Sequence, residues 1–227
     1  MVDAVSDGQN YDLEARSVAV TRMSGFSVLF ALGDPRAVLH WFDFLCPFCY
    51  IGQSRNDLLE RHGLNIIHQP FRAHPDIPPG GIEVGSRRGP MYAMLDQEAT
   101  AAGLPLFWPH RLPDTRTALA AAEWIREHHA GVSRQFNKEL FAAHFARGED
   151  LGNPELIRRY AGGLGVDLDS LDAALIDRSG QAAVERSERM GRGYGVQGTP
   201  SWLVGGRLVV GLLSAVEFEQ VAKVAAK

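Results

Sequence analysis

The chain has 227 residues, 45% of them hydrophobic and 22% charged, so it is long enough for one sizeable core or for a core with an inserted subdomain. Its formal net charge of −4 provides no basic stripe that could follow a phosphate backbone, which argues against a nucleic-acid partner. No stretch approaches the roughly 18 consecutive apolar residues of a membrane span, and residues 1–22 lack the apolar segment of an export signal, so we expect a cytoplasmic protein with no membrane partner.

The N-terminal region begins with a predicted extension at residues 1–25, because the first 22 residues are polar and show no periodicity. A first strand is predicted at 26–32, where a short apolar run is closed by the turn signal of residues 33–35. A second strand is predicted at 37–44. It is apolar at nearly every position, as expected of a strand that is buried on both faces.

A helix is predicted at 47–62, with Gly63 as its C-terminal stop, and a third strand at 64–71. These elements form a strand–helix–strand unit. A proline- and glycine-rich segment at 75–81 then ends the periodic pattern, and almost all of 88–193 has helical character.

The C-terminal part resumes the strand pattern after residue 200. Two short strands are predicted at 201–204 and 207–210, joined by the hairpin signal Gly205-Gly206, and a last helix is predicted at 214–225. This order predicts an α/β domain made of residues 26–85 and 194–227, which carries a helical insertion at 86–193.

The chain's only two cysteines, Cys46 and Cys49, stand where the second strand meets the following helix. Unpaired N–H groups and the positive end of the helix dipole stabilise a thiolate there, and the thiolate is the nucleophile in disulfide exchange. We therefore expect an exposed Cys46 to attack or be attacked, and Cys49, one turn later, to resolve the mixed disulfide. Pro47 suits the first helical position, where its missing N–H costs nothing.

Other interpretations of these residues remain open. The two cysteines can be unrelated buried thiols, although their place in one motif favours a redox pair. A zinc site needs four ligands, and His40 and His74 would have to complete it without zinc-finger spacing, so no metal site is predicted. Asp43 is a candidate for tuning or relaying protons to the resolving thiol, or for capping the following helix.

The combination of a C-x-x-C at a strand–helix junction, a Thr-Pro about 150 residues later and helices between them resembles the thioredoxin fold in its DsbA-like form. Residues 43–52, Asp-Phe-Leu-Cys-Pro-Phe-Cys-Tyr-Ile-Gly, look like the FrnE-type branch, whose members typically read D-x-x-C-P-W-C-Y-x-G. Segments 70–78, 139–141 and 195–200 also match. The resemblance covers about residues 37–223 and implies a thioredoxin-like fold with a mixed central sheet and an inserted helical subdomain.

Three residues depart from the branch pattern. Phe48 replaces the usual tryptophan, and His74 and Asp114 each replace an asparagine where the family has its substrate pocket. Phe48 is a candidate apolar contact for substrate. The resemblance also implies a cis bond between Thr199 and Pro200, which would place extended backbone beside the dithiol for pairing with a substrate peptide or with glutathione.

The leading hypothesis is an intracellular thiol–disulfide oxidoreductase that acts through a mixed disulfide on protein or small-molecule thiols and disulfides. No bound cofactor is expected, and glutathione is a candidate co-substrate.

A second hypothesis is a glutathione-dependent isomerase or transferase resembling the 2-hydroxychromene-2-carboxylate isomerases and kappa-class transferases. These enzymes usually carry serine where Cys46 stands and have no use for Cys49. A third is a non-catalytic binding module whose dithiol senses redox state. A homodimer through the helical insertion is a candidate assembly.

Overall fold

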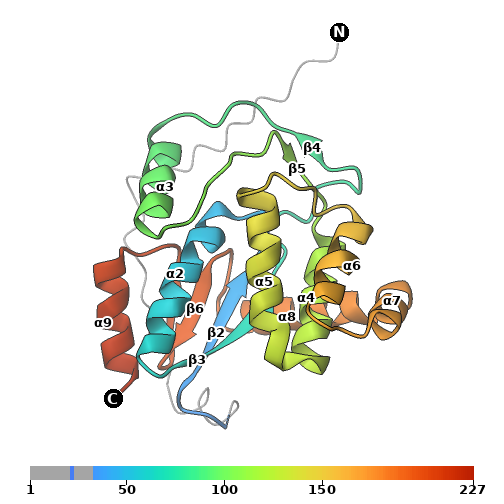
Figure 1. Cartoon of the computed structure of the whole chain (residues 1–227). Helices are drawn as coiled ribbons and strands as arrows, with labels where there is room; N and C mark the ends of the chain where they lie inside the picture. The colour runs from blue at the N-terminus through green and yellow to red at the C-terminus, as the bar shows by residue number, and fades with distance from the viewer. Residues whose placement is uncertain (1–20, 23–32) are drawn as a thin grey trace.

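A computed structural model of the chain describes residues 21–22 and 33–227 (Figure 1). The central sheet contains β1 (Thr21–Arg22), β2 (Ala37–Phe42), β3 (Asn65–Pro70), β6 (Ser201–Val204) and β7 (Arg207–Val210). These strands lie in the order β1-β7-β6-β2-β3. Because β3 is parallel to β2 while β6 is antiparallel to β2, the sheet is mixed, as the resemblance implied. The strand predicted at 26–32 lies outside the described residues.

The predicted strand–helix–strand unit is present. β2 is buried at every position, which agrees with its nearly continuous apolar sequence. α2 (Pro47–Arg61) follows it, and Gly63, with a φ of 77°, turns the chain back toward β3. β2 ends two residues before its predicted end because the chain turns there: the Cys46 N–H donates to the Asp43 carbonyl at 3.1 Å.

The segment between β3 and β6 is mainly helical, as predicted. Its helices are α3 (Pro90–Ala101), α4 (Arg116–His128), α5 (Ala130–Phe145), α6 (Pro154–Gly163), α7 (Leu168–Ile176) and α8 (Ser179–Gly193). A small antiparallel ribbon of β4 (Ile82–Glu83) and β5 (Arg111–Leu112) was not predicted, because two residues are too few to show a strand periodicity. Among the described helices, none combines the length and the apolar character that crossing a membrane requires.

α2 and α9 (Ala215–Ala225) cover one face of the sheet, as Figure 1 shows at the left of the molecule. Val38 of β2 and Trp202 of β6 project toward this face, where they share a buried cluster with Leu59 of α2 and Phe218 of α9. This packing fixes α2 against the middle of the sheet, and with it the dithiol at the start of α2.

α8 packs on the opposite face of the sheet. The indole N–H of Trp41 donates to the Ser187 carbonyl at 3.3 Å, and Met190 packs against the same cluster as Trp41. A Cβ atom added at Gly191 would lie 2.7 Å from the Trp41 indole nitrogen, so glycine is required for this close approach. The segment predicted as an insertion, 86–193, therefore ends in a helix that covers the sheet itself.

Helices α4, α5, α6 and α7 supply most of the largest buried cluster of the described residues, and this cluster reaches the dithiol. Phe44 and Tyr50, which flank the C-x-x-C, pack with Leu140, Phe141 and Phe145 of α5. The Tyr50 ring stacks on Phe145 with ring centres 5.0 Å apart. The start of α2 thus lies at the junction between the sheet and the helical segment.

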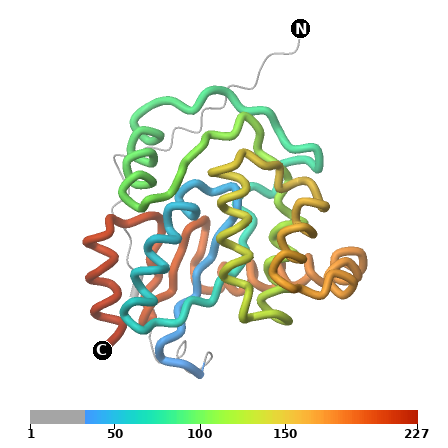
Figure 2. The backbone as a smooth tube through the Cα atoms, in the orientation of Figure 1, coloured from blue at the N-terminus to red at the C-terminus, as the bar shows by residue number. Residues whose placement is uncertain are grey.

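The C-terminal hairpin of β6 and β7 lies beside β2, as the neighbouring red and blue segments of Figure 2 show. Its strands have the predicted bounds, and Gly205 and Gly206 turn the chain with positive φ values of 54° and 75°. Thr21 and Arg22, expected within an unstructured extension, instead pair with Leu208 and Arg207 as an edge strand.

Candidate active site

The dithiol occupies the first turn of α2. Cys46 is the N-cap residue and Pro47 takes the first helical position. The Cys46 carbonyl accepts hydrogen bonds from the N–H groups of Cys49 and Tyr50, at 3.0 and 3.1 Å. Both cysteines are free thiols. The strand–turn–helix geometry therefore presents the leading sulfur at the positive end of the helix.

Neither thiol is widely exposed. Cys46 is 8% exposed and Cys49 is completely buried. The prediction of an exposed Cys46 is wrong, because the segment around Thr199, which is distant in the sequence, covers this residue. The Cys46 thiol donates to the Thr199 carbonyl at 3.3 Å. Cys46 is nevertheless the less buried residue of the two.

The two thiols differ in acidity. Burial alone would raise the pKa of Cys46. Hydrogen bonds from the Cys49 thiol, the Thr199 side chain and the Cys49 backbone N–H outweigh this effect, so the pKa of Cys46 lies below that of an ordinary cysteine. Burial and the adjacent Cys46 sulfur raise the pKa of Cys49 well above the ordinary value. As the pH rises, Cys46 is therefore the first of the two thiols to lose its proton.

The peptide bond between Thr199 and Pro200 is cis, as the resemblance implied. The Pro200 carbonyl accepts from the Gly211 N–H at 2.9 Å, which holds this segment to the chain that follows β7. The Thr199 hydroxyl oxygen is buried and has no hydrogen-bond partner among the described residues. It is therefore free to donate to a thiolate at Cys46.

Asp43 is buried behind the dithiol, but it does not cap α2. Its carboxylate accepts hydrogen bonds from the Leu45 N–H at 3.2 Å, the Ala73 N–H at 2.8 Å and the Thr115 hydroxyl at 3.1 Å. It therefore joins the turn before Cys46 to the loop after β3 and the start of α4. Burial raises the pKa of Asp43, and its charge in turn raises the pKa of Cys46.

The three residues that depart from the branch pattern have separate surroundings. Phe48 is half-buried and packs at the edge of the helical core. His74 follows the loop residue that binds Asp43, and its positive form lowers the pKa of that carboxyl group. Asp114 accepts from the Arg116 guanidinium at 2.9 Å. Contact of these side chains with substrate stays a prediction.

His40 does not join His74 near the cysteines. It lies on β2 against α2, with its Nδ1 3.1 Å from the Nδ1 of His68 on β3 and 3.2 Å from the amide nitrogen of Asn56. Within residues 21–22 and 33–227, no three histidine, cysteine, aspartate or glutamate side chains are arranged to hold a metal ion.

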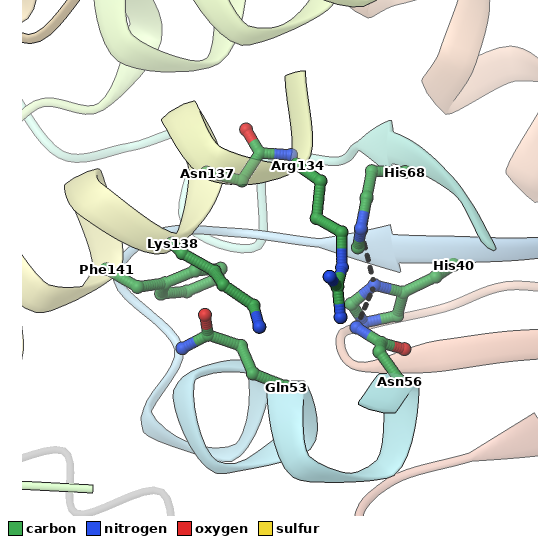
Figure 3. Close-up of a pocket in the computed structure, with 8 residues that line it drawn as sticks. All are labelled: His40, Gln53, Asn56, His68, Arg134, Asn137, Lys138 and Phe141. Atoms are coloured by element: carbon green, nitrogen blue, oxygen red, sulfur yellow. Dashed lines mark hydrogen bonds between the residues drawn. The ribbon is translucent and has the colours of Figure 1, made fainter. Parts of the chain in front are cut away.

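This histidine pair belongs to a polar cluster that the sequence did not predict. Figure 3 shows side chains from β2, β3, α2 and α5 around a cavity of about 10 Å³. The cavity is lined by His40, Gln53, Asn56, His68, Arg134, Asn137, Lys138 and Phe141. The one signal in the sequence is a histidine at the fourth position of each of two parallel strands, and His40 and His68 are indeed partners in the strand register.

The sequence also matches known proteins. Residues 37–223 match the family described as the DSBA-like thioredoxin domain. The chain belongs to this family. The DsbA-like chain is 22% identical to the uncharacterized protein YwbO of Bacillus subtilis (strain 168) in an alignment of 186 residues that covers 78% of this chain and 91% of YwbO.

The fold of this DsbA-like protein is shared by solved structures of low sequence identity. A probable DsbA oxidoreductase from Streptomyces coelicolor superposes with a TM-score of 0.70 at 22% identity, covering 83% of this chain and 89% of that one. A 2-hydroxychromene-2-carboxylate isomerase gives 0.66 at 18% identity, over 82% and 94% of the two chains. The cytosolic disulfide reductase DsbM from Pseudomonas aeruginosa, solved with GSH, gives 0.58 at 18% identity, over 84% and 96%.

Proposed function

We propose that the protein is an intracellular thiol–disulfide oxidoreductase in which Cys46 forms the mixed disulfide and Cys49 resolves it. One observation carries this proposal: within a single helical turn the less buried cysteine, Cys46, has a lowered pKa and the fully buried Cys49 a strongly raised one. An acidic thiol attacks as a thiolate. A buried and protonated thiol stays unreactive until a mixed disulfide forms next to it, and then attacks that disulfide.

The exchange has two steps. In the reducing direction, the Cys46 thiolate attacks one sulfur of a substrate disulfide, and the other substrate sulfur leaves as a thiolate that takes up a proton. Cys49 then loses its proton and attacks the Cys46 sulfur, which releases the first substrate sulfur as a thiolate that takes up a proton in exchange for the one from Cys49. The substrate is reduced to two thiols and the protein holds a Cys46–Cys49 disulfide. The reverse sequence oxidises a dithiol, and the reduction potential of the pair relative to its compartment sets the direction.

The substrate contacts that we propose lie around Cys46. The backbone of Thr199 and Pro200 supplies an extended edge beside the sulfur, and Phe48 supplies an apolar surface next to it. Pro47 supplies no titratable group, so the acidity of Cys46 depends on its hydrogen-bonding neighbours. We also propose glutathione as the thiol co-substrate and the cytoplasm as the compartment, supported by the likeness to a cytosolic disulfide reductase that was solved with GSH.

A glutathione-dependent isomerase is the second candidate, supported by the shared fold of the 2-hydroxychromene-2-carboxylate isomerase. Such an enzyme activates the sulfur of glutathione and needs no resolving thiol. The buried Cys49, directly behind Cys46, therefore favours the oxidoreductase.

The Cys49→Ser variant separates these candidates. An oxidoreductase lacking its resolving thiol accumulates a stable mixed disulfide at Cys46 when it is mixed with oxidised glutathione, and mass spectrometry of the intact protein detects it. Turnover of a model disulfide should fall by at least about tenfold, since release then depends on an external thiol. The Cys46→Ser variant should form no adduct. Full disulfide-exchange activity in Cys49→Ser would contradict the proposal.

A further inference from the structure

A buried chain of polar groups connects the two segments that form the dithiol site. The indole N–H of Trp202 donates to the side-chain oxygen of Asn56 at 2.7 Å, and the Asn56 amide nitrogen lies 3.2 Å from Nδ1 of His40. The His40 ring stacks on Trp202 with centres 4.7 Å apart and planes at 13°. All three side chains are buried. The chain thus links β6, α2 and β2 inside the core.

The direction of each hydrogen bond in this chain is fixed by its first member. An indole nitrogen can only donate, so the Asn56 oxygen accepts from Trp202 and the Asn56 NH₂ group faces His40. Nδ1 of His40 must then accept, and the ring carries its proton on Nε2. Burial and the nearby His68 keep the pKa of His40 well below its ordinary value, so this neutral form persists at physiological pH.

The cavity beside this chain is not a substrate site. Its volume of about 10 Å³ has room for roughly one water molecule, whereas ligand pockets measure hundreds of cubic ångströms. Arg134 and Lys138 line it and oppose a metal cation (Figure 3). What the cluster can affect is the way β6, α2 and β2 are held together.

Those elements carry the reactive groups. Trp202 follows Thr199 by three residues, and Asn56 lies on α2, seven residues beyond Cys49. α2 approaches Trp202 a second time at Gly52, where an added Cβ atom would lie 3.2 Å from the indole ring. Gly52 and Asn56 are one turn apart on one face of α2. Trp202 is therefore docked on the dithiol helix by packing, against Gly52 and in the cluster that contains Leu59, and by one hydrogen bond.

We propose that Asn56 is a positioning residue for Cys46: by holding Trp202 on α2, it holds Thr199 against the reactive sulfur and so sets the reactivity of that sulfur. The inference rests on the proposed function for its catalytic meaning, but the geometry that it describes exists in the reduced protein. Cys46 and Thr199 are 153 residues apart in the chain, so their 3.3 Å contact depends on how α2 and β6 are docked.

The experiment is the pH profile of Cys46 alkylation by iodoacetamide in the reduced full-length chain, with the modified residue identified by peptide mass mapping. In Asn56→Leu the midpoint of the profile should move to higher pH, because Thr199 lowers the pKa of Cys46. The alkylation rate at pH 7 should fall by roughly threefold, the effect of losing one modest hydrogen bond. Trp202→Phe, which keeps an aromatic ring but loses the N–H, should produce the same shift. The double variant should add nothing further.

Asn137→Leu is the matched control. It is the same substitution at another buried asparagine of the same cavity, outside the chain that reaches Trp202. A general loosening of the core would move the profile in both variants, whereas a positioning role moves it only in Asn56→Leu.

An unchanged profile in Asn56→Leu overturns the inference, as does an equal shift in Asn137→Leu or full additivity in the double variant. If Asn56→Leu does not fold, Trp202→Phe decides by the same readout. Failure of the proposed function is separately visible: the wild-type protein would then form no Cys46–Cys49 disulfide in a glutathione redox titration, while its alkylation profile would still test the positioning of Cys46.

Discussion

Asp43 places a buried carboxylate near the Cys46 sulfur, and its charge makes Cys46 less acidic. We expect Asp43→Asn to move the midpoint of Cys46 alkylation to lower pH, because the substitution removes that charge. The same change should lower the free energy of unfolding by about 1–3 kcal/mol, since the new NH₂ group would face the N–H donor of Leu45 or Ala73. Iodoacetamide kinetics and urea unfolding measure the two effects.

Asp114→Asn controls for a loss of negative charge near the start of α4. Asp114 is partly exposed and bound to Arg116, so its replacement should leave the Cys46 profile in place. A profile that moves to higher pH in Asp43→Asn would show that the carboxylate supports the thiolate by another route.

The residues of the site were predictable to the extent that they are neighbours in the sequence. Cys46, Pro47 and Cys49 form one local motif, and their placement on the first turn of α2 follows from it. The small exposure of Cys46 was not predictable, because its cover comes from Thr199, 153 residues later. The partners of His40 were hidden for the same reason, since strand register is a property of the folded sheet.

At the scale of single elements, α8 packs closely on the sheet at Gly191. We expect Gly191→Ala to lower the free energy of unfolding by about 1–3 kcal/mol, because the new Cβ atom would collide with the buried indole of Trp41. Gly193→Ala, two residues later on the same helix, meets open space and should raise it by about 0.5–1 kcal/mol. Chemical denaturation of both variants gives the comparison. Equal effects of the two substitutions would mean that α8 does not press on Trp41.

The elements were predicted best where local chemistry marks both ends. The hairpin at 201–210 has its predicted bounds because Gly205 and Gly206 specify the turn. Strands of two residues carry no periodic signal, so β1, β4 and β5 were missed. Helical periodicity also says that a helix has a buried side without saying what covers it, and for that reason the docking of α8 on the sheet could not be foreseen.

For the whole molecule, buried histidines predict a loss of stability in acid. Burial lowers the pKa of His68 to about 4, with help from Arg134 and Lys138, and burial lowers that of His144 to about 4. Between pH 6.5 and 4 the unfolded chain therefore binds protons that the folded chain does not, so stability falls as the pH falls through this window. Unfolding free energies measured in urea at pH 7.5 and 5.0 should differ by roughly 1–2 kcal/mol for each such histidine.

His144→Leu should make that pH dependence shallower. Neither ring nitrogen of His144 has a hydrogen-bond partner among the described residues, so an apolar side chain should cost little at pH 7.5. The exposed His110, replaced by glutamine, serves as the control and should leave the dependence as it is. An unaltered slope in His144→Leu would exclude this histidine as a source of the acid sensitivity.

The thioredoxin-like part of the molecule is interrupted in the chain, and this has a consequence for its synthesis. A ribosome that adds about 5–20 residues per second needs roughly 8–30 s to pass from Cys46 to Thr199, 153 residues later. During that time the nascent polypeptide carries the Cys46 sulfur without the Thr199 segment that later covers it. Because the chain has no third cysteine, the hazard before translation ends is a mixed disulfide with a foreign thiol or oxidation of a sulfur, and a reducing environment lessens both.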